Sequence, residues 1–245
     1  LSDKNVLLQA KNLFSFQLNS NYKVKNLKIN STIDFDEIYF NENIQNIVYL
    51  KNGKIKSKYE KNQFFANLSS NFAFIDNKDL KNNFKNNTLE LILKKKNGKN
   101  IEVQGNIYNE NTLINPQIIL KLFKLDPNFI SDDKINIQTD NEFQLEIDKK
   151  NKIKKYLLNS NIKLDKLTPN KSFQSLFFLR NVKTDLTLNN ESLKVDLTSN
   201  YSFFNDKYNN SQDDNSFDLK LEKINKSGSN VEIFFNTKDN KINTK

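Results

Sequence analysis

The stretch from Leu193 to Phe203, LKVDLTSNYSF, alternates apolar and polar residues. Leu193, Val195, Leu197, Tyr201 and Phe203 share one parity, and the residues between them are polar. Successive side chains of a β-strand point to opposite faces of a sheet. The alternation therefore predicts a strand with one apolar and one polar face.

The same period of two recurs along the whole chain, whereas helical spacing is nearly absent. Predicted strands cover residues 13–18, 22–35, 44–50, 55–59, 64–74, 89–93, 101–107, 135–137, 143–147, 156–164, 182–188, 193–204, 217–221 and 231–235. The polar connections between them are short, which favours hairpins between neighbouring strands. The predicted fold class is all-β and mainly antiparallel, built from consecutive hairpins.

The connection around Gly98 shows how strand register can be worked out from parity. A two-residue turn would place the apolar residues of its two strands on opposite faces. A three-residue loop, 96–98, instead pairs Leu93 with Ile101 and Leu91 with Val103. It also places Gly98 at the left-handed position that such loops require.

The connection 189–192 is the second predicted hairpin. Its flanking apolar residues differ in parity, so a loop of even length brings them onto one face. This register pairs Leu188 with Leu193 and Leu186 with Val195.

Three dipeptides interrupt the alternation. Asn52-Gly53 is a favoured turn sequence and predicts a third hairpin between strands 44–50 and 55–59. Asn115-Pro116 and Thr168-Pro169 each resemble a helix cap followed by proline. Apolar residues follow both at helical spacing: Ile118, Ile119, Leu122 and Phe123 after the first, and Phe173, Leu176 and Phe177 after the second. They predict two short amphipathic helices that pack against the sheet or cover part of its apolar face.

The charge pattern argues against nucleic-acid binding. The chain of 245 residues has 38 Lys and Arg, 29 Asp and Glu, and a net charge of +9. These lysines occupy polar positions of almost every strand, with acidic residues interspersed, which is typical of a solvated face. A nucleic-acid site would cluster the basic residues, so no nucleic-acid partner is predicted.

Residue types that usually perform catalysis are missing or scattered. There is no His and no Cys, which removes the commonest general base, the Cys and Ser-His nucleophiles and most transition-metal sites. One acidic cluster, Asp34, Asp36 and Glu37, belongs to a predicted strand, and both of its aspartates have the polar parity. Two acidic pairs, Asp132-Asp133 and Asp213-Asp214, fall in turns, where Asp is common without a chemical role. We predict a protein that is not an enzyme, has no catalytic residue and needs no metal or cofactor.

The chain has no Met and begins at Leu1, in the middle of the pattern, so we interpret it as a piece of a longer protein. Its longest apolar runs are about four residues, against the roughly 20 that a spanning helix needs. We expect residues 1–245 to form a single elongated segment, with a subdivision near 115–134.

Two stretches carry a family resemblance: 24–35, VKNLKINSTIDF, and 47–55, IVYLKNGKI. With their long alternating strands and Asn/Lys polar faces, they resemble the AsmA-like proteins of Gram-negative envelopes, relatives of TamB and YhdP. The resemblance implies a curved β-sheet groove that crosses the periplasm and is anchored in the inner membrane by an N-terminal helix outside this chain. Its concave apolar face would carry phospholipid acyl chains between the inner and outer membranes, and its membrane contacts would come from parts of the parent protein absent here.

On this hypothesis the groove is lined by the apolar parity of four strands. The candidate lipid-binding residues are Leu89, Leu91, Leu93, Ile101, Val103, Leu186, Leu188, Leu193, Val195, Leu197, Tyr201 and Phe203. One alternative is a closed β-sandwich that serves as an adhesin or structural surface module, because two apolar sheet faces can also cover each other. A membrane barrel ranks behind both, since the strands lack aromatic girdles and regular lengths.

Overall fold

A computed structural model describes residues 7–39, 48–74, 86–96, 98–117, 120, 126–169, 177–203, 215–224 and 231–238. These residues form twelve strands and one short 3₁₀ helix. The elements are β1 (Leu8–Leu18), β2 (Val24–Tyr39), β3 (Val48–Glu60), β4 (Gln63–Phe74), β5 (Thr88–Lys96), β6 (Ile101–Ile114), η3 (Pro127–Phe129), β7 (Ile135–Ile147), β8 (Ile153–Leu167), β9 (Phe177–Asn189), β10 (Ser192–Phe203), β11 (Ser216–Ile224) and β12 (Val231–Lys238).

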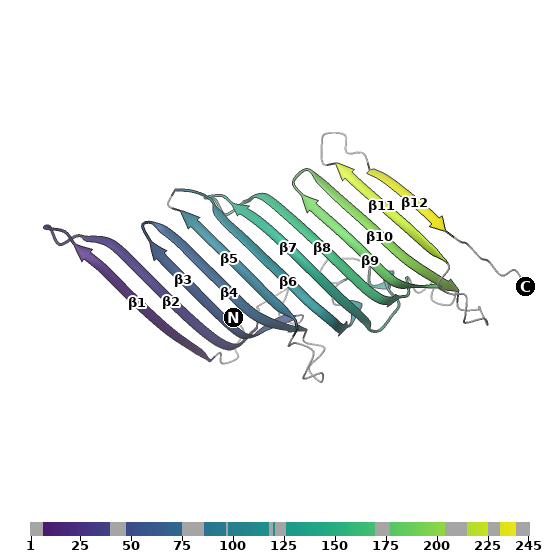
Figure 1. Ribbon diagram of the computed structural model, residues 1–245, viewed down its shortest axis with the longest axis horizontal. Coiled ribbons are helices and arrows are strands. Elements are labelled where there is room, and N and C mark those ends of the chain that lie inside the picture. Colours follow the sequence, from purple (N-terminus) through teal and green to yellow (C-terminus); the bar gives the residue numbers. More distant parts are fainter. Residues whose placement is uncertain are drawn as a thin grey trace, which may run out of the picture. The chain divides into compact units, whose positions relative to one another are not determined.

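All twelve strands belong to one sheet, in the order in which they occur in the chain (Figure 1). β1 and β12 are its two edges. The prediction of an all-β, mainly antiparallel fold made of consecutive strands is confirmed. Contacts divide the chain into two compact units: unit 1 is Leu1–Tyr108 with Glu142–Leu157, and unit 2 is Asn109–Asn141 with Leu158–Lys245.

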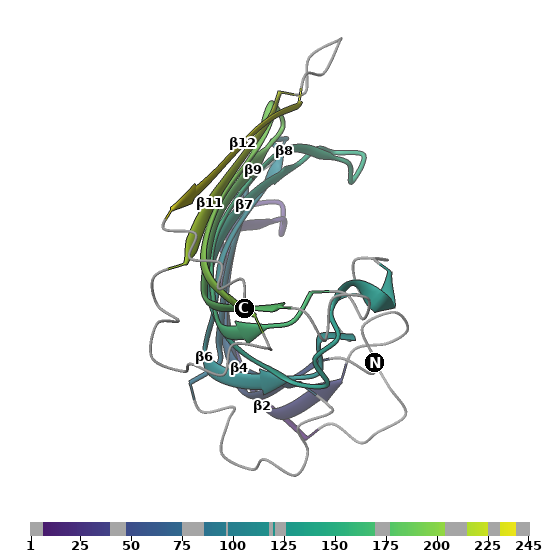
Figure 2. The same cartoon turned by 90° about the vertical axis from the view of Figure 1, so that its right-hand side faces the viewer.

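In unit 1 the strand registers place apolar residues in rows across the sheet. Ile33 pairs with Ile55, Ile55 with Leu68, and Leu68 with Leu91. We call the face that carries this row the inner face of unit 1 and the opposite one its outer face. The same strands bend along their length and are not flat (Figure 2).

In unit 2 the corresponding row joins four strands. Leu186 pairs with Val195, Val195 with Leu221, and Leu221 with Ile233. This row defines the inner face of unit 2. The predicted pairs Leu188–Leu193 and Leu186–Val195 are both present, so the register of the second hairpin is confirmed.

In the first predicted hairpin, the apolar residues of both strands lie on one face, as predicted, but the predicted register is wrong. Gly98 has a positive φ of 72°, as predicted, but Leu93 pairs with Val103 and Leu91 pairs with Gly105. The pair nearest the turn is Lys95–Ile101, so the loop is two residues longer than predicted, and Lys99 N donates a hydrogen bond to Lys96 O within it. A slip of two residues keeps every side chain on its own face, so parity could not detect it.

The predicted hairpin at Asn52-Gly53 is wrong. β3 continues through this dipeptide, and the ladder with β4 shifts register between Lys51 and Lys54. Asn52, with a φ of 50°, lies in a β-bulge, which uses the same left-handed conformation as a turn. The chain reverses instead at Lys61-Asn62, where both φ angles are positive, as in the favoured two-residue hairpin turn.

The two predicted helices do not appear as elements in the part of the chain that the structure describes. Near the first, Pro116, Gln117 and Leu120 are helical and Asn115 Oδ1 accepts a hydrogen bond from Gln117 N, but Ile118, Ile119, Leu122 and Phe123 lie outside the described residues. At the second, Pro169 forms an isolated bridge with Ile130, and Phe177 begins β9. Residues 170–176 between them lie outside the described residues. The 3₁₀ helix η3 was not predicted.

An internal repeat, which parity alone does not reveal, relates the two halves of the sequence. Residues 2–74 align with residues 131–203 without a gap. The identical pairs are Ser2/Ser131, Asp3/Asp132, Gln9/Gln138, Asn12/Asn141, Phe14/Phe143, Lys23/Lys152, Lys25/Lys154, Asn30/Asn159, Ser31/Ser160, Ile33/Ile162, Asp36/Asp165, Asn41/Asn170, Gln45/Gln174, Leu50/Leu179, Asn52/Asn181, Lys54/Lys183, Leu68/Leu197, Ser70/Ser199, Asn71/Asn200 and Phe74/Phe203. After a loop that is one residue shorter in the second copy, Asn87, Leu91 and Leu93 match Asn215, Leu219 and Leu221.

The backbone repeats with the sequence. Asn19 Oδ1 accepts hydrogen bonds from Asn21 N and Lys23 N, and Asp148 Oδ1 accepts them from Lys150 N and Lys152 N, at the matching positions. The third residue of the first turn and its match, Tyr22 and Asn151, both have positive φ. β1–β6 and β7–β12 are therefore two copies of one six-stranded module.

Candidate functional site: the inner face

In unit 1 the predicted site residues lie together on the inner face of β5 and β6. Leu89 pairs with Ile107, Leu91 with Gly105 and Leu93 with Val103. Ile101 lies on the same face, opposite Lys95. All five predicted residues, Leu89, Leu91, Leu93, Ile101 and Val103, are half-buried.

The inner face of unit 1 extends beyond the predicted residues. A buried cluster of Phe35, Leu50 and Phe72 lies at its centre. Partly buried apolar side chains pack against this cluster: Ile38, Val48, Ile55, Leu68, Phe74, Leu89 and Ile107. Parity could have located these residues too, because most of them lie in strands that were predicted.

In unit 2 the predicted residues lie together on β9 and β10. Leu186, Leu188, Leu193, Val195, Leu197 and Tyr201 are half-buried, and Phe203 is paired with Phe177 in the ladder, although its side chain is not among those described. Aromatic rings continue this face onto the next strands. The ring centroids of Tyr201 and Phe217 are 6.4 Å apart, and those of Phe217 and Phe235 are 5.5 Å apart.

Two glycines in unit 1 make room for large side chains. A Cβ atom on Gly53 would lie 1.8 Å from Phe35 Cζ, so the Phe35 ring rests directly on the backbone of β3. A Cβ on Gly105 would lie 2.5 Å from Phe143 Cζ and 2.6 Å from Leu91 Cδ2. Both glycines therefore allow apolar side chains of neighbouring strands to cover the sheet backbone closely.

A polar band interrupts the inner face, which is less uniform than the sequence suggested. In unit 1, Ser31 Oγ donates to Asn12 Oδ1 at 2.5 Å. In unit 2 the matching pair has Ser160 Oγ donating to Asn141 Oδ1 at 2.5 Å. These side chains satisfy each other, so an apolar surface can include them at low cost.

The unit 2 pair belongs to a longer chain of hydrogen bonds. Asn141 Nδ2 donates to Thr139 Oγ1 at 3.0 Å, and Thr139 Oγ1 donates to Asn109 Oδ1. Asn109 Nδ2 then donates to Ile137 O at 2.8 Å. The chain of side chains crosses three neighbouring strands and ties them together.

Each inner face has a lysine near the hairpin end of its strands. Lys95 lies between Phe64 and Ile101 in the strand ladder. Its match in the repeat, Lys223, lies between Leu193 and Val231. Each cation therefore lies between apolar residues of the two neighbouring strands, near the hairpin end of its own strand.

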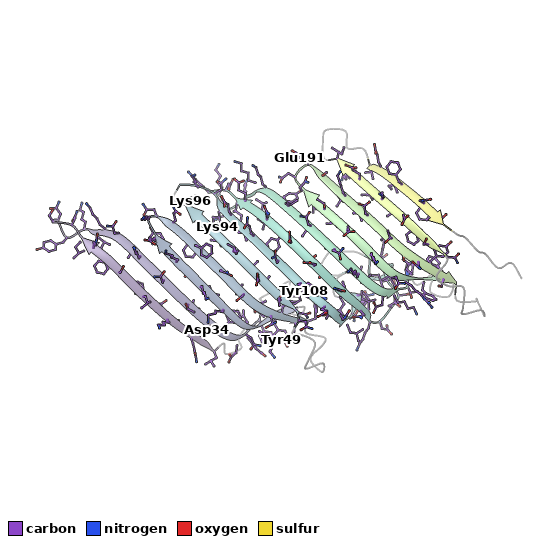
Figure 3. The ribbon with its side chains drawn as sticks, viewed as in Figure 1. Asp34, Tyr49, Lys94, Lys96, Tyr108 and Glu191 are labelled. Carbon is purple, nitrogen blue, oxygen red and sulfur yellow. The ribbon has the colours of Figure 1, made fainter. Side chains whose placement is uncertain are left out.

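The outer face carries most of the charged side chains of the strands, among them Asp34 of β2 and Lys94 of β5, which are labelled in Figure 3. Lys54 Nζ is 3.1 Å from Asp34 Oδ1, and Lys194 Nζ is 2.9 Å from Glu222 Oε1. Hydrogen bonds from Lys28 and Lys58 lower the pKa of Glu60 to about 2. These pairs explain the lysine-rich polar parity as a solvated, ion-paired surface.

The outer face also holds a small aromatic stack at one end of β2 and β3. The rings of Tyr39 and Tyr49 are 5.0 Å apart and nearly parallel, at 9°. Burial, together with the hydrogen bond from Tyr39 to Glu37, raises the pKa of the Tyr39 hydroxyl to about 12. Lys51 Nζ lies 5.9 Å from the centre of the Tyr49 ring.

The acidic candidates serve structural roles where they are described. Asp34 and Glu37 pair with Lys54 and Lys51. Asp132 accepts hydrogen bonds from Thr168 N at 2.5 Å and from Thr168 Oγ1 at 2.9 Å, and so holds the end of β8. Asp213-Asp214 lies outside the described residues. Within the described ranges, no group of three or more potential metal ligands comes together.

Comparison of the chain with protein-family models, with curated proteins and with solved structures found no match. Among the described residues, no helix has both the length and the apolar character needed to cross a membrane.

Proposed function

We propose that the inner face of each unit binds the acyl chains of phospholipids and that the protein is a non-enzymatic segment of a lipid-transfer protein of the AsmA-like kind. In this proposal the parent protein lies in the periplasm, and an N-terminal helix outside this chain anchors it in the inner membrane. Phospholipids pass along it between the inner and outer membranes. The observation that carries the proposal is the row of half-buried apolar side chains on one face of a single-layered sheet.

Among the described residues, a single layer leaves this face without a second sheet to cover it. Every described strand belongs to the same sheet, yet residues such as Leu91 and Val195 remain half-buried. Each buried acyl methylene contributes about 0.8 kcal/mol, so a lipid chain lying on the face replaces water favourably. The mutually satisfied pairs Asn12–Ser31 and Asn141–Ser160 create no charge that would hold the lipid at one point.

The lysine near the hairpin end of each unit adds a polar counterpart. A phospholipid has an anionic phosphate at one end of its apolar chains. A lipid lying parallel to the strands on the inner face would place its phosphate near Lys95 in unit 1 or Lys223 in unit 2, where an ammonium group stabilises the anion.

Site-specific photo-crosslinking tests the proposal. A photoreactive amino acid at Leu91 or at Val195 is expected to capture phospholipid in Gram-negative cells, which mass spectrometry of the purified adduct would detect. The matched controls are Glu102 and Lys194, which lie on the outer face of the same units. They should give no lipid adduct, because the residue next in sequence along a strand faces the opposite way.

Equal lipid capture at Val195 and Lys194 would reject a specific apolar site and indicate nonspecific membrane contact. Crosslinks to protein alone at both inner positions would reject the lipid proposal in favour of the alternative, an adhesin or structural module whose apolar face is covered by another protein surface. The closed β-sandwich form of that alternative has no second sheet among the described strands.

A further inference from the structure

The inner face of unit 1 is open at one end of its strands. β4 shows the difference along its length: Phe64, near the hairpin turn, is 38% exposed, Leu68 is half-buried, and Phe72 is 6% exposed. A phospholipid that lies parallel to the strands keeps its acyl chains away from water when they point towards Phe72. Its headgroup then lies at the hairpin end, where water can solvate it.

This open end carries the turns of four hairpins, β1–β2, β3–β4, β5–β6 and β7–β8, and all four belong to unit 1 (Figure 1). We define the hairpin rim of unit 1 as the described residues of these turns together with the two strand residues on each side: 17–25, 59–64, 95–96, 98–102 and 146–154. Successive turns are two strand spacings apart, about 10 Å. That distance is close to the Debye length at 0.1 M salt, so the charges of neighbouring turns act together.

The hairpin rim is strongly basic. Its ten lysines are all exposed: Lys23, Lys25, Lys61, Lys95, Lys96, Lys99, Lys149, Lys150, Lys152 and Lys154. Its carboxylates are four: Glu60, Glu146 and Asp148, and Glu102 on the outer face. The excess of cations is therefore much larger here than in the chain as a whole, where 38 basic residues stand against 29 acidic ones.

Groups of the chain itself engage the carboxylates of the rim. Glu60 Oε2 is 2.7 Å from Lys58 Nζ. Glu146 Oε1 accepts a hydrogen bond from Asn100 Nδ2 at 2.5 Å, and Asp148 Oδ1 accepts two from backbone amides of its own turn. The rim therefore offers a ligand many ammonium groups and few acceptors for a cation.

We infer that the hairpin rim makes the inner face of unit 1 select phospholipids whose headgroup has a net negative charge over zwitterionic phospholipids. Both kinds of lipid have a phosphate that an ammonium group such as that of Lys95 stabilises. A zwitterionic headgroup also carries a cation, which the surrounding lysines repel. The inference rests on the proposed function and adds the headgroup class to it.

Unit 2 provides an internal comparison, because the hairpin end of its strands is not basic. By the same definition, the described residues at the hairpin end of β9 to β12 include one lysine, Lys223, and two carboxylates, Glu191 and Glu232. Glu191 lies in the copy of the β3–β4 turn, where unit 1 has Asn62. We expect the inner face of unit 2 to bind both headgroup classes equally.

Competition between two lipids tests the inference. The purified chain carries a photoreactive amino acid at Leu91, four residues before Lys95 on β5, or at Val195 in unit 2. Each protein is mixed with vesicles of equal parts phosphatidylglycerol and phosphatidylethanolamine, and mass spectrometry measures the ratio of the two lipids captured. At Leu91 the anionic lipid should exceed the zwitterionic one about fivefold, the factor that corresponds to about 1 kcal/mol for a lysine near an anionic lipid. At Val195 the ratio should be close to one.

A matched pair of variants separates the rim from net charge. Lys95→Gln with Lys99→Gln removes two rim lysines and should lower the ratio at Leu91 towards one. Lys11→Gln with Lys56→Gln removes the same charge from the outer face of β1 and β3, where both lysines lie opposite Thr32 in the ladder, and should leave the ratio unchanged.

Each contrary result has its own meaning. A ratio close to one at Leu91 would overturn the inference and leave the proposed function standing. Equal enrichment at Leu91 and Val195, or equal loss of enrichment in both double variants, would also overturn it, because the net charge of the chain would then explain the preference. Capture of lipid at neither position would overturn the proposed function itself, and the inference with it.

Discussion

Gly53 and Gly98 show two different reasons for glycine in one β protein. Gly98 has a φ of 72° and nothing within 4 Å of its absent Cβ, so only its backbone conformation requires glycine. At Gly53 the space itself is taken by the Phe35 ring. The sequence predicted the first, because Asn-Gly marks a turn, but it could not predict the second, which depends on a residue far away in the chain.

Gly98→Val should lower the free energy of unfolding by about 1 kcal/mol or more, because a β-branched residue is strained at positive φ. Gly98→Asn is the control and should cost less, since Asn tolerates this region. Urea denaturation of the two variants checks the difference. An unchanged midpoint for Gly98→Val would contradict the left-handed turn.

Gly53→Val should cost about 1–3 kcal/mol through overpacking against Phe35. Phe35→Leu in the same chain removes the ring and should recover part of that loss. A double-mutant cycle by urea denaturation measures this coupling, and strictly additive effects would mean that the ring does not lie on Gly53.

Glu60 makes the stability of unit 1 depend on pH. Its pKa in the folded protein is lowered to about 2 by Lys28 and Lys58. A lowered pKa contributes stability that is present above the ordinary glutamate value and is lost as the pH falls through the folded value. The urea midpoint should therefore decrease between about pH 4.5 and 2. Glu60→Gln should reduce that decrease and leave the midpoint at pH 2 nearly unchanged; an equally steep decrease in the variant would show that other carboxylates cause it.

At the scale of elements, the β3–β4 hairpin and its copy β9–β10 use one bulge design. Asn52 and Asn181 have φ angles of 50° and 49°. Opposite each bulge a buried serine lies near a backbone oxygen of the bulged strand: Ser70 Oγ is 2.9 Å from Lys51 O, and Ser199 Oγ is 3.1 Å from Arg180 O. Such agreement in backbone, side chain and sequence explains why these polar residues are identical in both copies.

The shared design predicts equal effects of equal substitutions. Ser70→Ala and Ser199→Ala should each cost about 1 kcal/mol, the usual net worth of one hydrogen bond. Asn52→Gly and Asn181→Gly should be nearly neutral, whereas the Val variants should cost about 1–2 kcal/mol. Urea denaturation of the variants in pairs is the measurement. Opposite behaviour of the two copies would mean that the repeat does not preserve the bulge.

For these elements, the sequence was sufficient wherever the apolar residues of two paired strands had to lie on the same face of the sheet. It predicted the strands and the Leu188–Leu193 register for that reason. It failed where the alternation of apolar and polar residues does not distinguish two structures. At Leu93 the register differs by two residues, which leaves every side chain on the same face. At Asn52-Gly53 a bulge and a turn require the same φ. It missed the repeat because most of the identical positions are Asn, Ser and Lys, which are common throughout this chain.

For the molecule as a whole, the property on which the lipid proposal depends is that all the described strands belong to a single layer of sheet. In a two-layered protein the inner residues of both layers would be sealed from water. Here unit 2 contains both buried positions, such as Val182 at 2% exposed, and half-buried ones, such as Val195. Parity predicted which residues form the inner face, but whether that face is covered depends on tertiary structure.

The two valines test this difference within unit 2. Val182→Asp should unfold the unit, because a carboxylate without a partner would be buried. Val195→Asp should leave the sheet folded with a modest loss of stability, since no described strand forms a second layer that would keep water from this face. Circular dichroism and urea denaturation of the two variants supply the comparison. Unfolding by both variants would mean that another layer covers the inner face, and it would remove the basis for a lipid site there. The other outcome is that Val195→Asp folds but no longer captures lipid at a nearby inner position. That result would show that lipid binding requires an apolar inner face and not only a folded sheet.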